Sequence, residues 1–111
     1  MGIDCEKVWR EFHEVVNMAP VEIADWLRTE ESRKVGFKAK GSGESVGHAS
    51  GRRIVAILSK EKAKLDDADY RHMRKVVGFV RRHRAQRPQN IYTSRWRYSL
   101  MNWGHDPARE E

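Results

Sequence analysis

Five cationic side chains within one short stretch give the sequence its clearest chemical pattern. They are Arg71, Arg74, Lys75, Arg81 and Arg82. On a helix that advances 100° per residue, all five fall between about 80° and 200° from Met73, on one face. A solvated helix surface usually mixes both signs of charge, but no acidic residue lies between Arg71 and Asp106. The pattern therefore predicts a face that binds phosphate groups.

Gly78 falls in the middle of this cationic face, at about 140° on the same wheel. Alanine would be about 1 kcal/mol better for a helix at that position. Glycine there suggests close approach by a nucleic-acid backbone or by the matching helix of a second copy. The polyanion is favoured, because cations on both sides of a symmetric helix contact would repel each other.

Residues 36–51 are rich in glycine and serine, which predicts a long loop. The loop leads into a helix, and free N–H groups at a helix start can hold an anion. The expected anion-binding residues are Gly47, His48, Ser50 and Gly51, followed by Arg52 and Arg53. A flexible linker, with Ser45 and Ser50 as helix caps, explains the same composition. No nucleotide-binding fingerprint is present.

Arg95 and Arg97 alternate with aromatic residues between positions 92 and 103. Interleaved cations and aromatics can bind single-stranded nucleic acid by stacking and charge. The favoured interpretation is that the apolar residues at i, i+4 and i+7 from Trp96 form the core face of a closing helix. Arg95 and Arg97 are then expected to be exposed contributors to a nucleic-acid interface.

No residue set predicts catalysis. His48 and Ser50 near the loop, or His105 and Asp106 near the end of the chain, are close in sequence, which does not establish a catalytic geometry. No metal site and no cofactor are expected, because no group of His, Cys, Asp and Glu has convincing ligand spacing. The chain is therefore not expected to be an enzyme.

The elements that position these residues are predicted to be helical. Apolar periodicity predicts a helix over 4–16, a second from Pro20, a third that starts near 48–51 and includes Leu65, a fourth over about 66–85 and a fifth over 94–104. Asp66 and Asp69 resemble a capping box, and Ser94 is a candidate cap. The expected fold is all-α: one compact domain over 1–111 with about five helices. It comprises an acidic helical pair at 4–32, the Gly-rich loop at 36–51 and basic helices at 52–104.

The 111 residues carry a net charge of +6 that is unevenly distributed. Through Ser32 there are three basic and eight acidic residues, a net of −5, and the remainder carries +11. Either the two parts neutralise each other in the fold, or the basic part is free for a partner. The single cysteine excludes disulfide-rich classes, and no stretch is apolar enough for a membrane span. A soluble, cytoplasmic protein is expected, associated with the nucleoid or nucleus if it binds DNA.

Several motifs are similar to those of a known family. They are the segments 21–27, 29–32, 43–48, 50–53, 72–76, 82–83, 85–88 and 96–107. Together they resemble a small family of uncharacterised microbial proteins, a domain of unknown function whose members are sometimes labelled DNA-binding. The resemblance covers roughly 8–107, supports a single domain and implies no catalytic residue.

The first functional hypothesis is a nucleic-acid-binding module, for DNA in preference to RNA, that grips phosphates and reads little sequence. The second is an interaction module or homodimer, in which the acidic segment of one copy meets the basic helix of another. The third is a small phosphate-ligand binder or enzyme centred on the Gly-rich loop.

Overall fold

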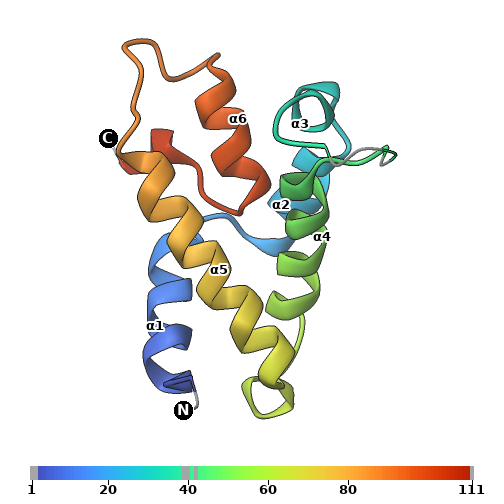
Figure 1. Cartoon of the computed structure of the whole chain (residues 1–111), viewed down its shortest axis with the longest axis vertical. Helices are drawn as coiled ribbons and strands as arrows, with labels where there is room; N and C mark the ends of the chain where they lie inside the picture. The colour runs from blue at the N-terminus through green and yellow to red at the C-terminus, as the bar shows by residue number, and fades with distance from the viewer. Residues whose placement is uncertain (1–2, 39–40, 42, 111) are drawn as a thin grey trace.

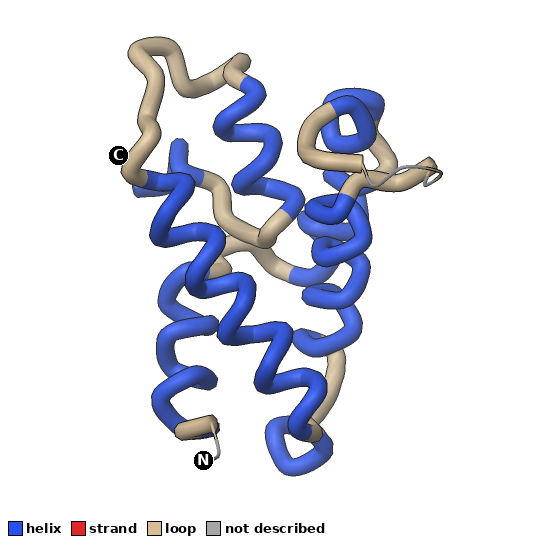
Figure 2. Tube along the Cα trace, viewed as in Figure 1, coloured by secondary structure: helices blue, strands red, loops and turns tan. Residues whose placement is uncertain are grey.

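The computed structural model describes residues 3–38, 41 and 43–110, and these form helices joined by loops (Figures 1 and 2). The α-helices are α1 (Cys5–Val15), α2 (Pro20–Leu27), α3 (Glu30–Lys34), α4 (Val46–Leu58), α5 (Asp67–Arg84) and α6 (Arg95–Asn102). Two 3₁₀ segments, η1 (Lys62–Lys64) and η2 (Pro107–Glu110), complete the secondary structure. The described residues contain no strand, which confirms the all-α prediction.

Helix α5 crosses the molecule diagonally between α1 and α4 (Figure 1). The closest pairings are α1 against α5 and α2 against α4. Helix α6 contacts α2, α3, α4 and α5 and closes the other end of the bundle. The result is a compact body of 38 × 35 × 27 Å in which α5 has one side on the core and the other facing out.

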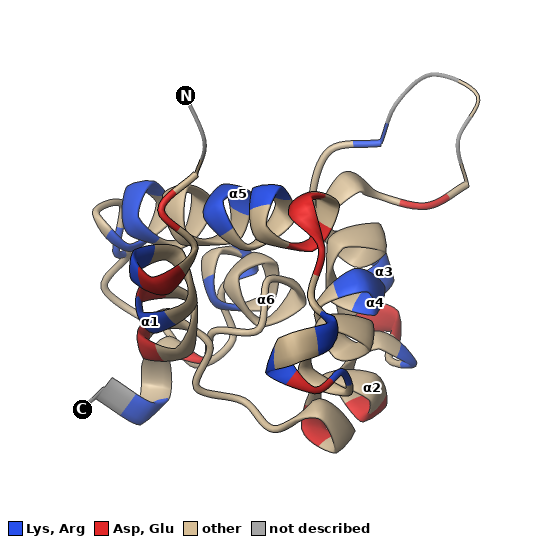
Figure 3. Ribbon diagram, turned by 90° about the horizontal axis from the view of Figure 1, so that it is seen from below, with Lys and Arg blue, Asp and Glu red and all other residues tan. Residues whose placement is uncertain are grey.

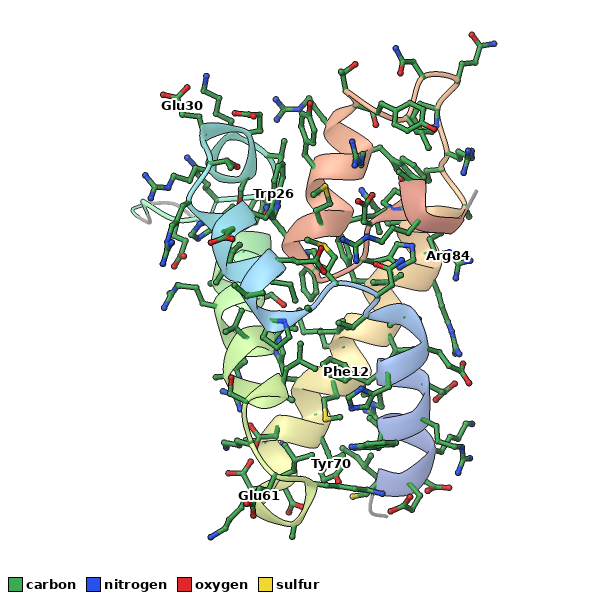
Figure 4. The ribbon with its side chains drawn as sticks, turned by 180° about the vertical axis from the view of Figure 1, so that it is seen from behind. Phe12, Trp26, Glu30, Glu61, Tyr70 and Arg84 are labelled. Atoms are coloured by element: carbon green, nitrogen blue, oxygen red, sulfur yellow. The ribbon has the colours of Figure 1, made fainter. Side chains whose placement is uncertain are left out.

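The core lies where α1, α2, α4, α5 and α6 meet. Phe12, Ile23, Ile54, Met73 and Leu100 are completely buried there, and Figure 4 shows Phe12 pointing from α1 into this centre. The predicted core stripe of α5 is confirmed, since its valines at 76, 77 and 80 are also buried.

The predicted helix starts are confirmed where a local signal marks them. The Asp66 side chain accepts a hydrogen bond from the Asp69 backbone N–H, and the Asp69 side chain accepts one from the Asp66 N–H, forming a complete capping box for α5. The Ser94 side chain caps α6 by accepting from the Arg97 N–H. Pro20 occupies the first position of α2.

The expected Gly-rich loop over 36–51 is wrong at its C-terminal end. Helix α4 begins at Val46, so Gly47, His48, Ser50 and Gly51 are all helical. Gly47 and Gly51 are buried because α4 packs closely against its neighbours. A Cβ on Gly51 would lie only 2.6 Å from the Asn102 carbonyl oxygen. The composition that suggests a flexible loop in fact permits this close approach.

Two smaller differences concern short or terminal elements. Helix α3 is additional to the expected helices, and five residues are too short to show a helical period. The third expected helix ends at Leu58, and Leu65 lies beyond it, after η1. Among the described residues, none of the helices combines the length and the apolar character needed to cross a bilayer.

A buried polar cluster fixes α6 against α2 and α3. The Asn102 side-chain oxygen accepts hydrogen bonds from the Trp26 indole N–H at 2.7 Å and from the Ser32 hydroxyl at 2.5 Å. The Asn102 amide donates to the Ser32 carbonyl at 3.0 Å. These polar groups are therefore paired, and they hold α6 against α2 and α3.

Candidate nucleic-acid interface

The cationic face of α5 contains four residues that we call the free stripe: Arg71, Arg74, Lys75 and Arg82. All four are exposed, and none has an acidic partner among the described residues. From 71 to 82 a helix rises about 16 Å, the length of about five base pairs of duplex DNA. Figure 3 shows the Lys and Arg positions of α5 in blue on the exposed side of the bundle.

Arg81 belongs to the predicted face, but it points to α1. Its guanidinium lies 2.8 Å from the Glu11 carboxylate. Glu11 is one of the acidic residues of the first third of the chain, so part of that acidity is neutralised within the fold. Arg81 is therefore paired, unlike the residues of the free stripe.

The two arginines of α4 are also paired. Arg53 lies 3.2 Å from Asp69, which Lys60 also contacts at 2.7 Å. Burial raises the pKa of Asp69, but the hydrogen bonds from Lys60 and Asp66 and both cations outweigh it, so the pKa lies below its usual value. Arg52 holds Glu44 through two hydrogen bonds of 2.6 and 2.8 Å.

Arg97 does not contribute an exposed charge, contrary to the sequence-based expectation. Its side chain is only 22% exposed and lies 3.0 Å from the carboxylate of Asp106. Burial raises the pKa of Asp106, but the Arg97 hydrogen bond and the Ala108 N–H together hold it below its usual value. Arg95 is exposed, and its guanidinium donates to the Lys34 carbonyl at 3.2 Å.

Gly78 lies within the free stripe, half-buried. The guanidinium of Arg82 folds back over it, so that a Cβ on Gly78 would lie only 3.0 Å from Arg82 Nη1. The absence of a side chain at Gly78 thus makes room for a cation that stays close to the helix surface.

Beside the free stripe, four aromatic rings form a column. Phe79 stacks between Trp103 and His83, with ring centroids 4.3 and 4.7 Å away. His72 lies parallel to the other side of Trp103 at 6.3 Å. This column places the edge of α6 directly against α5.

A pocket of about 230 Å³ opens next to this column. Its apolar walls include Phe37, Val46, Phe79 and Trp103, and two cations of the free stripe, Lys75 and Arg82, also line it. Gly47 also lines the pocket. Its lack of a side chain makes room for Trp103, since a Cβ on Gly47 would lie 2.9 Å from the Trp103 indole nitrogen. The structure thus brings the stripe and an aromatic pocket together.

A neighbouring hollow contains a buried serine beside a half-buried histidine. Ser50 Oγ lies 2.9 Å from His72 Nε2, and Arg53 and Lys75 line the same hollow. Burial lowers the pKa of His72 to about 4, with the charges of Arg53 and Lys75 acting in the same direction. A serine beside a neutral histidine resembles the nucleophile and base of a catalytic triad. However, no described residue hydrogen-bonds to His72 Nδ1, so the third group that would orient the histidine is missing from the described part of the chain. The contact joins α4 to α5.

The start of α4 is occupied by groups of the chain itself. The Ser45 side chain accepts the His48 N–H at 3.0 Å. His48 contacts the Glu44 carboxylate through Nδ1 and the Leu27 carbonyl through Nε2 at 2.7 Å. Hydrogen bonds from Arg52 and His48 lower the pKa of Glu44 to about 2, so a negative charge already lies beside the predicted anion site. Anion binding there stays a prediction, and Glu44 opposes it.

The apolar half of the candidate site has little signature in the sequence. Phe37 lies within the Gly-rich segment, where no periodic pattern distinguishes it, and Val46 and Trp103 are brought to it by tertiary packing. Phe79 does carry a signal, since on the wheel it lies about 120° from Met73, outside the core stripe. Within the described part of the chain, no cluster of three or more His, Cys, Asp or Glu side chains could hold a metal ion.

A family model matches the chain. The model of the family described as "Protein of unknown function (DUF3140)" matches residues 11–101, which is most of the chain. This confirms the predicted resemblance to an uncharacterised family. No curated protein and no solved structure matches the chain.

Proposed function

The chain belongs to the DUF3140 family, and we propose that it is a nucleic-acid-binding module, with DNA as the expected ligand. The free stripe on α5 carries this proposal. Its four exposed cations have no acidic partner among the described residues, whereas Arg52, Arg53, Arg81 and Arg97 all do. A row of unpaired cations along a helix is suited to a phosphate backbone, because each contact releases counterions.

Phosphate contacts are expected to dominate over base reading. The free stripe holds no Asn or Gln to recognise adenine, so sequence preference should be weak. Four phosphate contacts predict that log K falls with log salt with a slope of about −3.6 for duplex DNA. Affinity should therefore fall about 100-fold between 50 and 200 mM salt.

The test compares two variants that lose the same charge. One replaces Arg71, Arg74 and Arg82 with Ala; the control replaces Arg10, Arg33 and Lys64, which are exposed on other elements. Binding of a labelled DNA oligonucleotide is measured by fluorescence anisotropy over a salt series. The stripe variant should lose nearly all affinity, with a slope near −1, because it retains one of four contacts. The control should keep most of the wild-type slope.

Two results would count against the proposal. Equal losses in both variants would show that only net charge matters, and salt-independent or absent binding by the wild type would exclude phosphate recognition. Circular dichroism of each variant establishes that the helices are intact, so that a loss of binding is not a loss of folding.

A further inference from the structure

The pocket beside the free stripe combines an apolar interior with a cationic edge. Phe37, Phe79 and Trp103 supply aromatic surface, and Lys75 and Arg82 supply positive charge. At about 230 Å³ the pocket is smaller than the roughly 300 Å³ at the lower end for drug-sized ligands. Its size therefore suits one small ring system.

The pocket exposes apolar surface that the fold does not cover. Four large hydrophobic side chains are strongly exposed among the described residues, and two of them, Phe37 and Val46, line this pocket. Phe37 is 72% exposed, and its carbonyl accepts the Val46 N–H at 2.7 Å, which ties its backbone to the start of α4. Exposed apolar surface that lies beside cations is typical of a ligand-binding surface.

One residue that lines the pocket, Trp103, has a hydrogen-bond donor that is not used within the described residues, and its indole nitrogen lies beside Gly47 of the pocket wall. The indole N–H groups of Trp26 and Trp96 donate to Asn102 and to the His83 carbonyl. The indole N–H of Trp103 has no acceptor in the described part of the chain. A ligand carbonyl or ring nitrogen in the pocket would satisfy it.

We infer that this pocket takes up a single unpaired nucleobase while Lys75 and Arg82 hold the flanking phosphates. The inference rests on the proposed function and specifies its ligand. A base has an aromatic face for Phe37 and Phe79, acceptors for the Trp103 indole, and an attached phosphate for each cation. Because bases in a continuous duplex are stacked inside, the chain should prefer single-stranded or bulged nucleic acid.

The test uses DNA probes that differ by one base and not in charge. The first is a duplex with one unpaired thymine, and the second is the same duplex with an abasic residue in its place. The wild-type chain should bind the thymine bulge about 10-fold more tightly, the effect of stacking one base. Phe37→Ala should remove this difference while leaving affinity for the abasic probe unchanged, because Phe37 is exposed and outside the core.

Tyr92→Ala is the matched control, because Tyr92 is an exposed aromatic that does not line the pocket. It should keep the 10-fold preference. Two results would contradict base binding in the pocket: equal wild-type affinity for the two probes, or an equal loss of the thymine preference in the Phe37 and Tyr92 variants. Either result would leave the free stripe as a phosphate-binding face. No binding to either probe would overturn the proposed function itself.

Discussion

The ionisation of His72 should couple to the stability of the fold. Burial is the main cause of its lowered pKa of about 4, and the charges of Arg53 and Lys75 add to it. In the unfolded chain a histidine titrates near 6.5, so the unfolded state binds more protons between about pH 6.5 and 4. Stability should therefore fall as the pH falls through this window, by roughly 2 kcal/mol after allowing for partial exposure.

Urea unfolding of the wild type and of His72→Gln at several pH values between 7 and 4 measures this contribution. Between pH 6.5 and 4, the free energy of unfolding of the variant should fall by roughly 2 kcal/mol less than that of the wild type. The difference between the two isolates His72, because His13 and His83, whose pKa values are also lowered by burial, are present in both. Identical pH profiles would assign the acid sensitivity to other groups.

At the scale of the helices, two glycines should respond in opposite ways to the same substitution. Gly51→Ala should destabilise the fold by about 1–3 kcal/mol, because its Cβ would meet the Asn102 carbonyl at 2.6 Å and a Leu27 methyl at 2.7 Å. Gly78→Ala should stabilise it by up to about 1 kcal/mol, since its Cβ would meet only the mobile tip of Arg82.

Thermal unfolding of both variants checks this pair. Opposite shifts in Tm are expected, and a higher Tm in both variants would show that α4 does not pack closely on α6. The Gly78 variant also tests the sequence-based hypothesis of close approach: a loss of DNA affinity in this more stable variant would place the backbone of the ligand over Gly78.

Helices with complete local signals are predictable from the sequence, and those shaped by tertiary contacts are not. The Asp66–Asp69 capping box and the valine stripe are sufficient to predict α5. In contrast, the glycines at the start of α4 have a local preference for loops, which the fit of Gly51 against Leu27 and Asn102 overrides. The same limit applies to the site. The helical wheel places the cations on one face, but the partner of Arg81 lies on α1, seventy positions away in the chain.

At the scale of the whole molecule, the acidic and basic parts of the chain partly neutralise each other through ion pairs. Acidic residues of the first third meet cations of the remainder: Glu6 contacts Lys62, Glu11 contacts Arg81, and Glu22 contacts Arg109. These acids are then less available to a second copy. Four of the cations that have no acidic partner among the described residues lie together on the free stripe, where two copies would repel each other.

The chain should therefore sediment as a monomer in the absence of DNA, at both 50 and 500 mM salt. Like charges on the stripe oppose self-association at low salt, and high salt weakens any attraction between an acidic segment and a basic helix. Sedimentation velocity measures this directly. A species of twice the mass that dissociates as salt is raised would instead support the interaction-module hypothesis.

Glu11→Gln further distinguishes the nucleic-acid-binding module from the interaction module. The substitution removes an acid from any contact between copies, and it frees Arg81 from its ion pair. In a monomeric module it should therefore strengthen DNA binding a few-fold.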